Sequence, residues 1–284
     1  MDLGLTGKVA LVTGSSRGIG RGIATRLLEE GADVVFCARG DEALGEAVAA
    51  VGGPGRAHGI VADVTTPEGA LAVVDAAVQA FGGLDIVVNN ASAVQRAPVL
   101  ETDMRRFDLM YQINTRGTFM VSKYAIPHLE KAKNPHILMN SPPLDLREKW
   151  FAGSTAYSIA KYGMSLVVLG LAGELRAKGI AVNALWPRAT IATAAIRNLL
   201  GGERVMRMSR APAIMADAAY LIFQKPSRSF TGNFLIDDTF LAAEGVSDFE
   251  QYRVDPSEPL ARTFFVPDEP PPPPGVSVTV ERWE

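Results

Sequence analysis

Apolar residues along most of the chain follow two alternating patterns. Short runs of buried type, rich in Val, Ile and Leu, alternate with longer stretches of helical periodicity. The short runs predict strands at residues 8–13, 33–37, 58–62, 84–89, 136–140, 180–186 and 233–236, and the longer stretches predict helices near 18–30, 41–51, 67–81, 103–131, 155–178 and 213–223. This alternation is typical of βαβ units with right-handed crossovers. It predicts an α/β fold with a doubly wound parallel sheet of about seven strands.

The pattern ends near residue 244, and the rest of the chain has a different composition. Residues 245–284 contain eight acidic residues, three Arg and eight of the 18 prolines, so this segment carries a net charge of −5 (3 − 8) and the preceding 244 residues carry +2. Five consecutive prolines, Pro270 to Pro274, favour polyproline II and exclude a helix or a central strand. We therefore expect one domain over residues 1–244 and a proline-rich, acidic C-terminal arm over 245–284.

The arm has two interpretations. An extended or partly disordered linker is the simpler one, and a partner-recognition motif is the alternative. Phe264, Phe265 and Trp283 are large apolar groups in this otherwise polar segment. They indicate that parts of the arm dock on the body or on a second subunit.

Composition limits the class of protein. The 48% of hydrophobic residues can fill a sizeable core, and a single cysteine excludes an intrachain disulfide and suits a reducing compartment. The 28 Lys and Arg against 31 Asp and Glu lack the basic excess of a nucleic-acid binder. The longest charge-free apolar stretch has 12 residues, and no secretory signal is visible after Met1. We expect a cytoplasmic protein that binds no nucleic acid, spans no membrane and, with three scattered His residues, holds no metal.

A glycine-rich turn, residues 13–20 (TGSSRGIG), lies between the first predicted strand and the first predicted helix. Gly14 permits a tight turn, Gly18 lets the backbone approach a pyrophosphate, and Gly20 lets the helix pack closely on the strand. The free N–H groups and the dipole of a helix N-terminus favour a negatively charged ligand. The turn therefore predicts a dinucleotide site in a Rossmann fold, with a purely structural turn as the alternative.

The end of the second predicted strand distinguishes between the two nicotinamide cofactors. An acidic residue at this place usually holds the free 2′-hydroxyl of NAD, whereas the 2′-phosphate of NADP requires cations. Here the strand ends in Cys37-Ala38-Arg39, and Arg17 lies in the turn on the same side. The sequence therefore favours NADP(H), with NAD(H) as the alternative. A solvated loop cation is the other interpretation of Arg39.

Tyr157 and Lys161 are four residues apart in a helical pattern, so they share one face of the helix. A phenol normally ionises near pH 10, but a neighbouring ammonium stabilises the phenolate and lowers the pKa of the Tyr. Such a pair can exchange a proton with a carbonyl or alcohol oxygen. Taken alone, the spacing is better explained by a surface pair.

In context, the chain resembles the short-chain dehydrogenase/reductase family. The resemblance is carried by the glycine turn, residues 89–91 (NNA), residues 113–115 (INT), Ser141, and the pair Tyr157 and Lys161, in the expected order between about residues 5 and 237. It implies that Tyr157 is the general acid/base and that Lys161 lowers its pKa and binds the nicotinamide ribose. It also implies a homodimer or homotetramer.

The resemblance assigns further residues to the site. Ser141 would polarise the substrate oxygen, and Asn114 would hold a water in a proton relay. The cofactor contacts would fall on Gly14, Ser16, Arg17, Gly18, Ile19, Gly20, Arg39, Asp63, Val64, Asn90, Ala91, Tyr157, Lys161, Pro187, Ile191 and Thr193. Residues 134–138, 157–165 and 184–187 resemble, more narrowly, the hydroxysteroid dehydrogenase-like branch, whose members can carry a sterol-carrier domain that these 284 residues do not include.

The sequence departs from the family pattern in three places. Sixteen positions separate Ser141 from Tyr157, which is more than usual, so we expect an insertion in the loop 142–151. Pro142 and Pro143 stiffen the chain directly after Ser141. Arg188 stands where the family usually has Gly, and we expect it to change the charge near the nicotinamide.

The main hypothesis is an NADP(H)-dependent oxidoreductase that interconverts a carbonyl and a secondary alcohol in a small, partly apolar molecule. A basic stretch formed by Arg188, Arg197, Arg204, Arg207 and Arg210 fits a solvated face or, as the alternative, recognition of a carboxylate or CoA. The alternative function is a catalytically weak nucleotide-binding scaffold or a lipid-associated protein. The departures from the family pattern motivate that second hypothesis.

Overall fold

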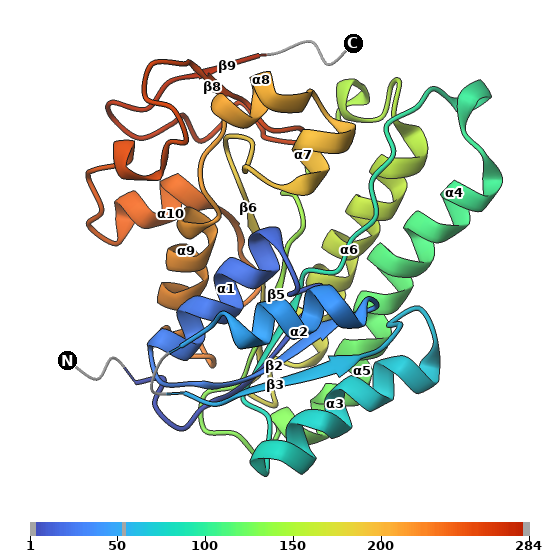
Figure 1. The fold of residues 1–284 in the computed structure, drawn as a ribbon, viewed down its shortest axis with the longest axis vertical. Coiled ribbons are helices and arrows are strands. Elements are labelled where there is room, and N and C mark those ends of the chain that lie inside the picture. The colour runs from blue at the N-terminus through green and yellow to red at the C-terminus, as the bar shows by residue number, and fades with distance from the viewer. Residues whose placement is uncertain (1–3, 53–54, 281–284) are drawn as a thin grey trace.

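The computed structural model describes residues 4–52 and 55–280 and has a layered α/β architecture (Figure 1). Its main sheet has seven parallel strands in the order β3-β2-β1-β4-β5-β6-β7. The strands are β1 (Val9–Thr13), β2 (Asp33–Ala38), β3 (Ala57–Val61), β4 (Ile86–Asn89), β5 (His136–Met139), β6 (Ala181–Trp186) and β7 (Phe234–Ile236). The doubly wound fold and all seven predicted strands are confirmed, with small shifts at the strand ends.

Side chains that alternate along the strands divide the core into two layers. In β1, Ala10 and Val12 face one apolar cluster, and Val9 and Leu11 face the other. The first layer is covered by α1 (Gly18–Glu29), α2 (Asp41–Ala49), α9 (Ala213–Phe223) and α10 (Asp237–Ala243), and the second by α3 (Pro67–Phe81), α5 (Thr118–Leu129) and α6 (Thr155–Glu174). Because helices cover both faces, the strands are apolar at successive positions rather than at alternate ones.

One helix of this core, α6, is also the one helix of the described residues with enough length and apolar character to cross a membrane. Its most apolar window is 61% buried inside the protein, and a buried core helix passes the same test. On the inner side of α6, Met164 and Val168 are fully buried.

The long helix predicted for residues 103–131 is interrupted. It consists of α4 (Met104–Met110), a π-helical segment (Tyr111–Gly117) and α5. A π-helical segment widens the helix by one residue per turn and often lies at a functional site. Here it includes Asn114, one of the candidate site residues, whose side chain is fully buried.

Several short elements were not expected from the sequence. They are α7 (Ala194–Leu199), α8 (Gly202–Arg207), α10, and the small parallel pair of β8 (Leu260–Ala261) and β9 (Val278–Thr279). Each has seven residues or fewer. Such short elements cannot repeat a hydrophobic pattern often enough to be distinguished from a loop.

The C-terminal segment corrects the expectation of an extended arm. Up to residue 280 it folds back over the body, and it contributes buried apolar side chains at Phe249, Tyr252, Phe265 and Val266 (Figure 1). The predicted docking of the Phe264 and Phe265 pair on the body is therefore confirmed. Trp283, for which docking was also predicted, lies outside the described residues.

Candidate active site

A cleft of about 760 Å³ opens at the carboxyl ends of the strands. Residues that directly follow six strands line it, in the chain order Gly14, Arg39, Ala62, Asn90, Asn140 and Pro187. The strand order reverses between β1 and β4, and ligands of open α/β sheets bind at such a switch point. The cleft is therefore the candidate active site.

The glycine turn has the geometry predicted from the sequence. Gly14 and Gly18 have φ values of +65° and +59°, in the left-handed region that favours glycine. A Cβ atom on Gly20 would lie 2.4 Å from the amide nitrogen of Asn90 and 2.5 Å from the carbonyl oxygen of Gly14, so α1 begins in close contact with the turn and with the end of β4. The side-chain amide of Asn90 donates to the carbonyl oxygens of Thr13 (3.0 Å) and Gly14 (3.1 Å) and fixes the turn from the other side.

The N-terminus of α1 fits a phosphate group. Arg17, its N-cap residue, has an extended backbone, and its side chain makes no capping hydrogen bond. The first N–H groups of the helix are therefore open toward the cleft, which Ser16, Arg17 and Ile19 line. Arg17 and Arg39 form no ion pair with a described carboxylate, and both lie on the lining of the cleft. This end of the cleft is positively charged and suits a dinucleotide.

Tyr157 and Lys161 lie one turn apart on α6, and both line the cleft. Their side chains are almost completely buried, at 8% and 3% exposure. The ammonium of Lys161 donates to the carbonyl oxygen of Asn140 at 2.9 Å, and burial lowers its pKa to about 7. Burial also raises the pKa of Tyr157, while the charge of Arg96 acts in the opposite direction. Both side chains are therefore held on the wall of the cleft, one helical turn apart.

Asn114 is close to the cleft but does not line it. Its Oδ1 accepts from the backbone N–H of Ala93 at 2.8 Å, and its Nδ2 donates to the carbonyl oxygen of the same residue at 3.0 Å. The side chain therefore ties the π-helical segment to the loop that follows β4. Its participation in a proton relay stays a prediction.

Ser141 is not brought to the cleft lining. Its side chain is fully buried, and its Oγ has no hydrogen-bond partner among the residues that the structure describes. The carbonyl of the next residue, Pro142, accepts from Ser165 on α6 at 2.6 Å, which holds the chain after Ser141 against that helix. The long spacing to Tyr157 and the two prolines already indicated this difference from the family pattern.

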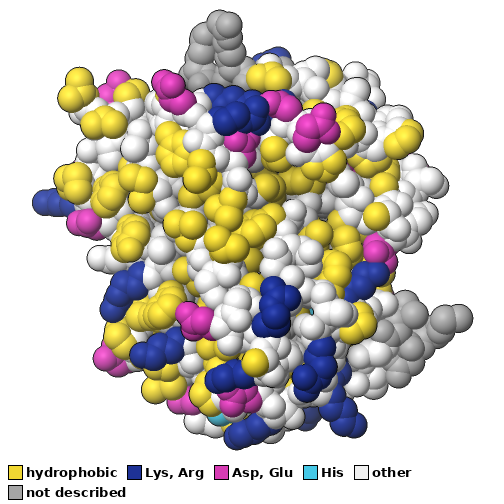
Figure 2. All heavy atoms as spheres, turned by 180° about the vertical axis from the view of Figure 1, so that it is seen from behind, with side chains coloured by type: hydrophobic (Ala, Val, Ile, Leu, Met, Phe, Trp, Pro, Cys, Tyr) yellow, Lys and Arg dark blue, Asp and Glu magenta, His cyan; other side chains and the backbone are white. Residues whose placement is uncertain are grey.

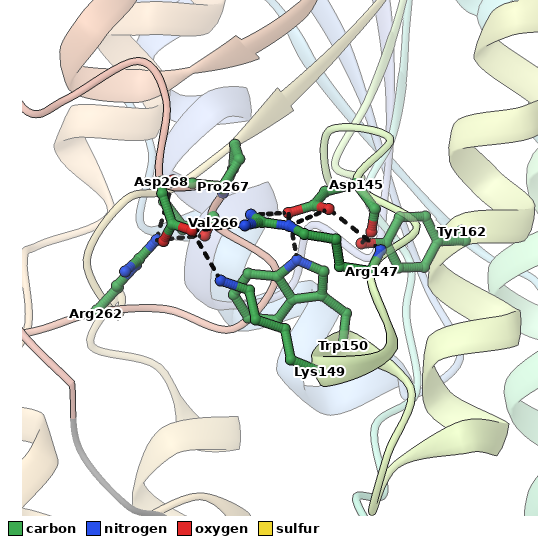
Figure 3. A network of polar contacts seen from close by, with 9 residues as sticks. All are labelled: Asp145, Arg147, Lys149, Trp150, Tyr162, Arg262, Val266, Pro267 and Asp268. Carbon is green, nitrogen blue, oxygen red and sulfur yellow. Dashed lines mark hydrogen bonds and ion pairs between the residues drawn. The ribbon is translucent and has the colours of Figure 1, made fainter.

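The loop after Ser141, where an insertion is predicted, folds against α6. Asp145 accepts a hydrogen bond from the indole of Trp150 at 2.6 Å through its carboxylate and one from the hydroxyl of Tyr162 at 2.6 Å through its backbone carbonyl. Figure 3 shows how the C-terminal segment joins this loop: the carboxylate of Asp268 accepts from Arg147 (2.7 Å) and Lys149 (3.0 Å).

The same C-terminal segment completes the wall behind Tyr157. The ring of Phe265 lies 5.7 Å from that of Tyr157 and 6.1 Å from that of Trp186, between centroids. Phe264 and Thr263 line the cleft itself. Sequence reasoning did not place these residues in the site, although the apolar pair in a polar segment was the available signal.

Arg188 corrects an expectation. It is buried and absent from the cleft lining. Its Nε donates to Asp238 at 2.8 Å, and its Nη2 donates to the hydroxyl of Thr239 (2.6 Å) and to the carbonyl of Pro270 (3.3 Å). It therefore fastens the C-terminal segment to the start of α10 instead of changing the charge near a nicotinamide. Arg210 pairs with the same Asp238 at 3.0 Å.

The other arginines of the predicted basic stretch are also engaged. Arg197 pairs with Glu203 at 2.6 Å and Arg207 with Glu258 at 3.3 Å. Arg204 has a partner as well. The five residues do not form one free basic surface, so the CoA or carboxylate interpretation of this stretch is not carried forward.

Most of the predicted site residues are brought together. Of the predicted cofactor residues, the following line the cleft: Gly14, Ser16, Arg17, Gly18, Ile19, Arg39, Asp63, Val64, Asn90, Ala91, Tyr157, Lys161, Pro187, Ile191 and Thr193. Gly20 packs behind the turn, and Ser141 and Asn114 are absent from the lining. The lining was thus largely predictable, whereas for the Ser the sequence indicated a departure from the family pattern but not where the side chain lies.

A doubly wound sheet, a glycine turn at its switch point, and a Tyr and a Lys one turn apart define a dinucleotide-dependent oxidoreductase fold. The model of the short chain dehydrogenase family matches residues 8–201. The chain belongs to the short-chain dehydrogenase/reductase family of oxidoreductases.

Relatives and solved structures of this family resemble the chain over most of its length. Hydroxysteroid dehydrogenase-like protein 2 of Danio rerio is 48% identical over 93% of this chain and 66% of its own length, and that of Homo sapiens is 45% identical over 94% and 65%. The chain thus spans about two thirds of the length of these relatives.

Among solved structures, a putative dehydrogenase from Xanthomonas campestris has a TM-score of 0.87 and 42% identity, over 93% of this chain and 99% of its own. A short chain dehydrogenase from Burkholderia cenocepacia in complex with NADP has a TM-score of 0.71 and 31% identity, over 82% and 96%.

Proposed function

We propose that the protein is an NADP(H)-dependent oxidoreductase that interconverts a carbonyl compound and a secondary alcohol, with Tyr157 as the general acid/base. The observation that carries this proposal is the placement of Tyr157 and Lys161 on the wall of the cleft that the glycine turn also lines. NADPH, when bound, would supply the hydride for the carbonyl carbon. The Tyr157 hydroxyl would give its proton to the carbonyl oxygen during reduction and take it back from the alcohol during oxidation.

Lys161 makes this proton transfer feasible near neutral pH. Burial along α6 disfavours both a phenolate on Tyr157 and an ammonium on Lys161, because it removes the water that would solvate each charge. The raised pKa of Tyr157 and the lowered pKa of Lys161 reflect this. During proton transfer the phenolate and the ammonium would form a charge pair, in which each would cancel part of the desolvation cost of the other. The hydrogen bond from Lys161 to the carbonyl of Asn140 holds the ammonium in place.

The experiment that tests the mechanism compares Tyr157→Phe with the wild-type protein. We expect turnover with a carbonyl substrate to fall by about 10²–10⁴-fold, the usual contribution of a general acid/base. NADPH affinity, measured by titration of nucleotide fluorescence, should change little because the ring is retained. Full turnover in Tyr157→Phe would refute the assignment.

The preference for NADP(H) is supported by the cationic end of the cleft. Arg17 and Arg39 line it, and Ala38 stands where an NAD-specific site carries an acidic residue. We expect Arg39→Asp to weaken NADPH binding by about 10- to 100-fold, since a charged hydrogen bond contributes about 1.5–3 kcal/mol, and to leave NADH binding equal or stronger. An unchanged ratio of the two affinities would contradict this preference.

A second candidate function is a nucleotide-binding scaffold or lipid-associated protein with little turnover. The burial of Ser141 away from the cleft lining favours it, because a substrate-polarising hydroxyl is then not available in this conformation. A panel of steroid, acyl and aromatic carbonyls distinguishes the two functions. Tight NADPH binding without oxidation of NADPH by any member of the panel would favour the scaffold.

We further propose that two copies associate through α5 and α6. On these helices Phe119, Leu166 and Leu169 are 48%, 56% and 53% exposed. Figure 2 shows hydrophobic side chains gathered over the middle and upper part of one face of the molecule. Exposed apolar patches of this kind mark interfaces. Light scattering should report a dimer or tetramer for the wild-type chain and a smaller species for Leu166→Glu/Leu169→Glu.

A further inference from the structure

Arg96 stands out among the cleft residues that the family resemblance did not assign. It lies on the loop after β4, and it lines the cleft together with Tyr157. Its guanidinium carbon is 4.1 Å from the centroid of the Phe264 ring, and its Nε donates to the hydroxyl of Ser154 at 3.2 Å. The stacked ring and the hydroxyl hold the planar guanidinium in one orientation on the wall of the cleft.

This guanidinium has no carboxylate partner among the residues that the structure describes. No carboxylate of residues 4–52 or 55–280 lies within ion-pair distance of Arg96, and its two Nη atoms make no hydrogen bond to any of those residues. Arg147 and Arg188, by contrast, both have carboxylate partners. Burial lowers the pKa of Arg96, yet a guanidinium stays protonated at any ordinary pH. A half-buried cation with free donors is therefore exposed to whatever occupies the cleft.

The residues around Arg96 indicate which kind of ligand would bind there. Arg106 of α4 also lines the cleft and has no ion pair with a described residue. Asp63, in the turn after β3, is the one acidic side chain among the cleft-lining residues within the described ranges, and it lies in the part assigned to the cofactor. The cleft lining also includes the apolar side chains of Val94, Leu109, Leu199 and Phe264, and the Phe264 ring lies against Arg96. This part of the cleft therefore presents a positively charged group, held in one orientation, within an apolar wall.

We propose that Arg96 binds a carboxylate on the substrate, so that the preferred substrate is an oxo acid, or the corresponding hydroxy acid, with an apolar remainder. The proposal rests on the function proposed above and specifies its substrate class. The flat fork of N–H donors matches the two oxygens of a carboxylate, and a charge-assisted pair in a partly dry site is stronger than one on the surface. Arg96 is in this view a specificity-determining residue beside Tyr157.

An alternative role for Arg96 acts only through Tyr157. Its positive charge favours the phenolate of Tyr157, so its removal could slow every substrate equally. Recognition of a carboxylate predicts a different result, namely a loss that depends on the charge of the substrate. The experiment therefore compares substrates of equal shape and different charge.

The turnover measurement uses an apolar oxo acid and its primary amide with wild-type protein, Arg96→Gln and Arg96→Lys. We expect the wild-type kcat/KM for the acid to exceed that for the amide by about 10- to 100-fold. Arg96→Gln should abolish this ratio by lowering kcat/KM for the acid far more than kcat/KM for the amide, and Arg96→Lys should retain part of the ratio. The control is Arg105→Gln, a neighbouring arginine of α4 that is exposed and outside the cleft lining, which should behave like wild type.

A binding measurement separates failure of this proposal from failure of the proposed reaction. Calorimetry of the NADPH complex with hexanoate and with hexanamide requires no turnover, and hexanoate should bind more tightly in wild type but not in Arg96→Gln. If this difference is found without turnover on any carbonyl, the carboxylate site stands and the reaction is wrong. Suppose that the protein reduces neutral carbonyls but binds hexanoate no more tightly than hexanamide, or that Arg96→Gln still binds hexanoate more tightly. Either result would refute the role of Arg96. An equal loss with acid and amide would likewise refute it.

Discussion

Lys161 allows a quantitative test of the site in the cofactor-free protein. Its side chain is 3% exposed, and burial lowers its pKa from 10.5 to about 7. Between these two pH values the unfolded chain binds a proton on this lysine that the folded chain does not. The stability contribution of Lys161 therefore rises as pH rises from 7 to 10.5, and its burial penalty is fully present below pH 7.

The size of the effect follows from the same shift. A displacement of roughly 3.5 pKa units at about 1.36 kcal/mol per unit gives about 5 kcal/mol as an upper bound. The hydrogen bond from the ammonium to the carbonyl of Asn140 stabilises the charged form and reduces this cost. We expect that Lys161→Met, which cannot be charged, is more stable than wild type by about 2–4 kcal/mol at neutral pH and that the difference shrinks toward about pH 10.

Urea unfolding of both proteins without nucleotide, at several pH values between about 6 and 10, measures this difference directly. Subtracting the two curves removes the titration of all other groups. Lys123→Met on α5 is the matched control, because this lysine is exposed and should give a difference near zero at every pH. A difference for Lys161→Met that does not depend on pH would show that the lysine is not desolvated in the folded protein, and the argument for its pairing with Tyr157 would fail.

Three further perturbations test other parts of the structure. Burial lowers the pKa of His136 to about 4. The free energy of unfolding should therefore fall by up to about 3 kcal/mol as pH falls from 6.5 to 4. In urea unfolding, His136→Asn should remove this part of the dependence on acid pH. Phe265→Ala should lower the free energy of unfolding by about 3–5 kcal/mol if the C-terminal segment unfolds together with the body. If the segment unfolds alone, limited proteolysis should show faster cleavage near residue 265. No change in either measurement would contradict the packing of Phe265. Gly20→Ala places a Cβ 2.5 Å from the carbonyl oxygen of Gly14, so the backbone must shift; we expect about 1–3 kcal/mol lower stability and weaker NADPH binding by fluorescence titration.

The sheet and the cofactor half of the site could be predicted because their signals are local. Most strands are largely apolar runs, and the glycine turn contains in eight residues the positions that the phosphate site requires. The spacing of Tyr157 and Lys161 likewise needs only the period of one helix to place both on one face. These features do not depend on which distant segments meet.

The parts that were missed depend on long-range contacts. Arg188 pairs with Asp238, and Phe265 meets Tyr157, across separations of 50 and 108 residues. Sequence patterns alone do not tell an arginine that pairs in the core from one that faces a ligand. The position of Ser141 depends in the same way on how the loop after it packs against Ser165.

The last described strand has a practical consequence for handling the protein. β9 pairs with β8, and Thr263 and Phe264, just after β8, line the cleft. A force applied to the chain beyond residue 280 would therefore act through the β8–β9 pair on the wall of the cleft. The chain ahead of β1 enters at the amino ends of the parallel strands, opposite the cleft, which lies at their carboxyl ends. Immobilisation on a sensor surface or fusion to a reporter should accordingly use the amino end.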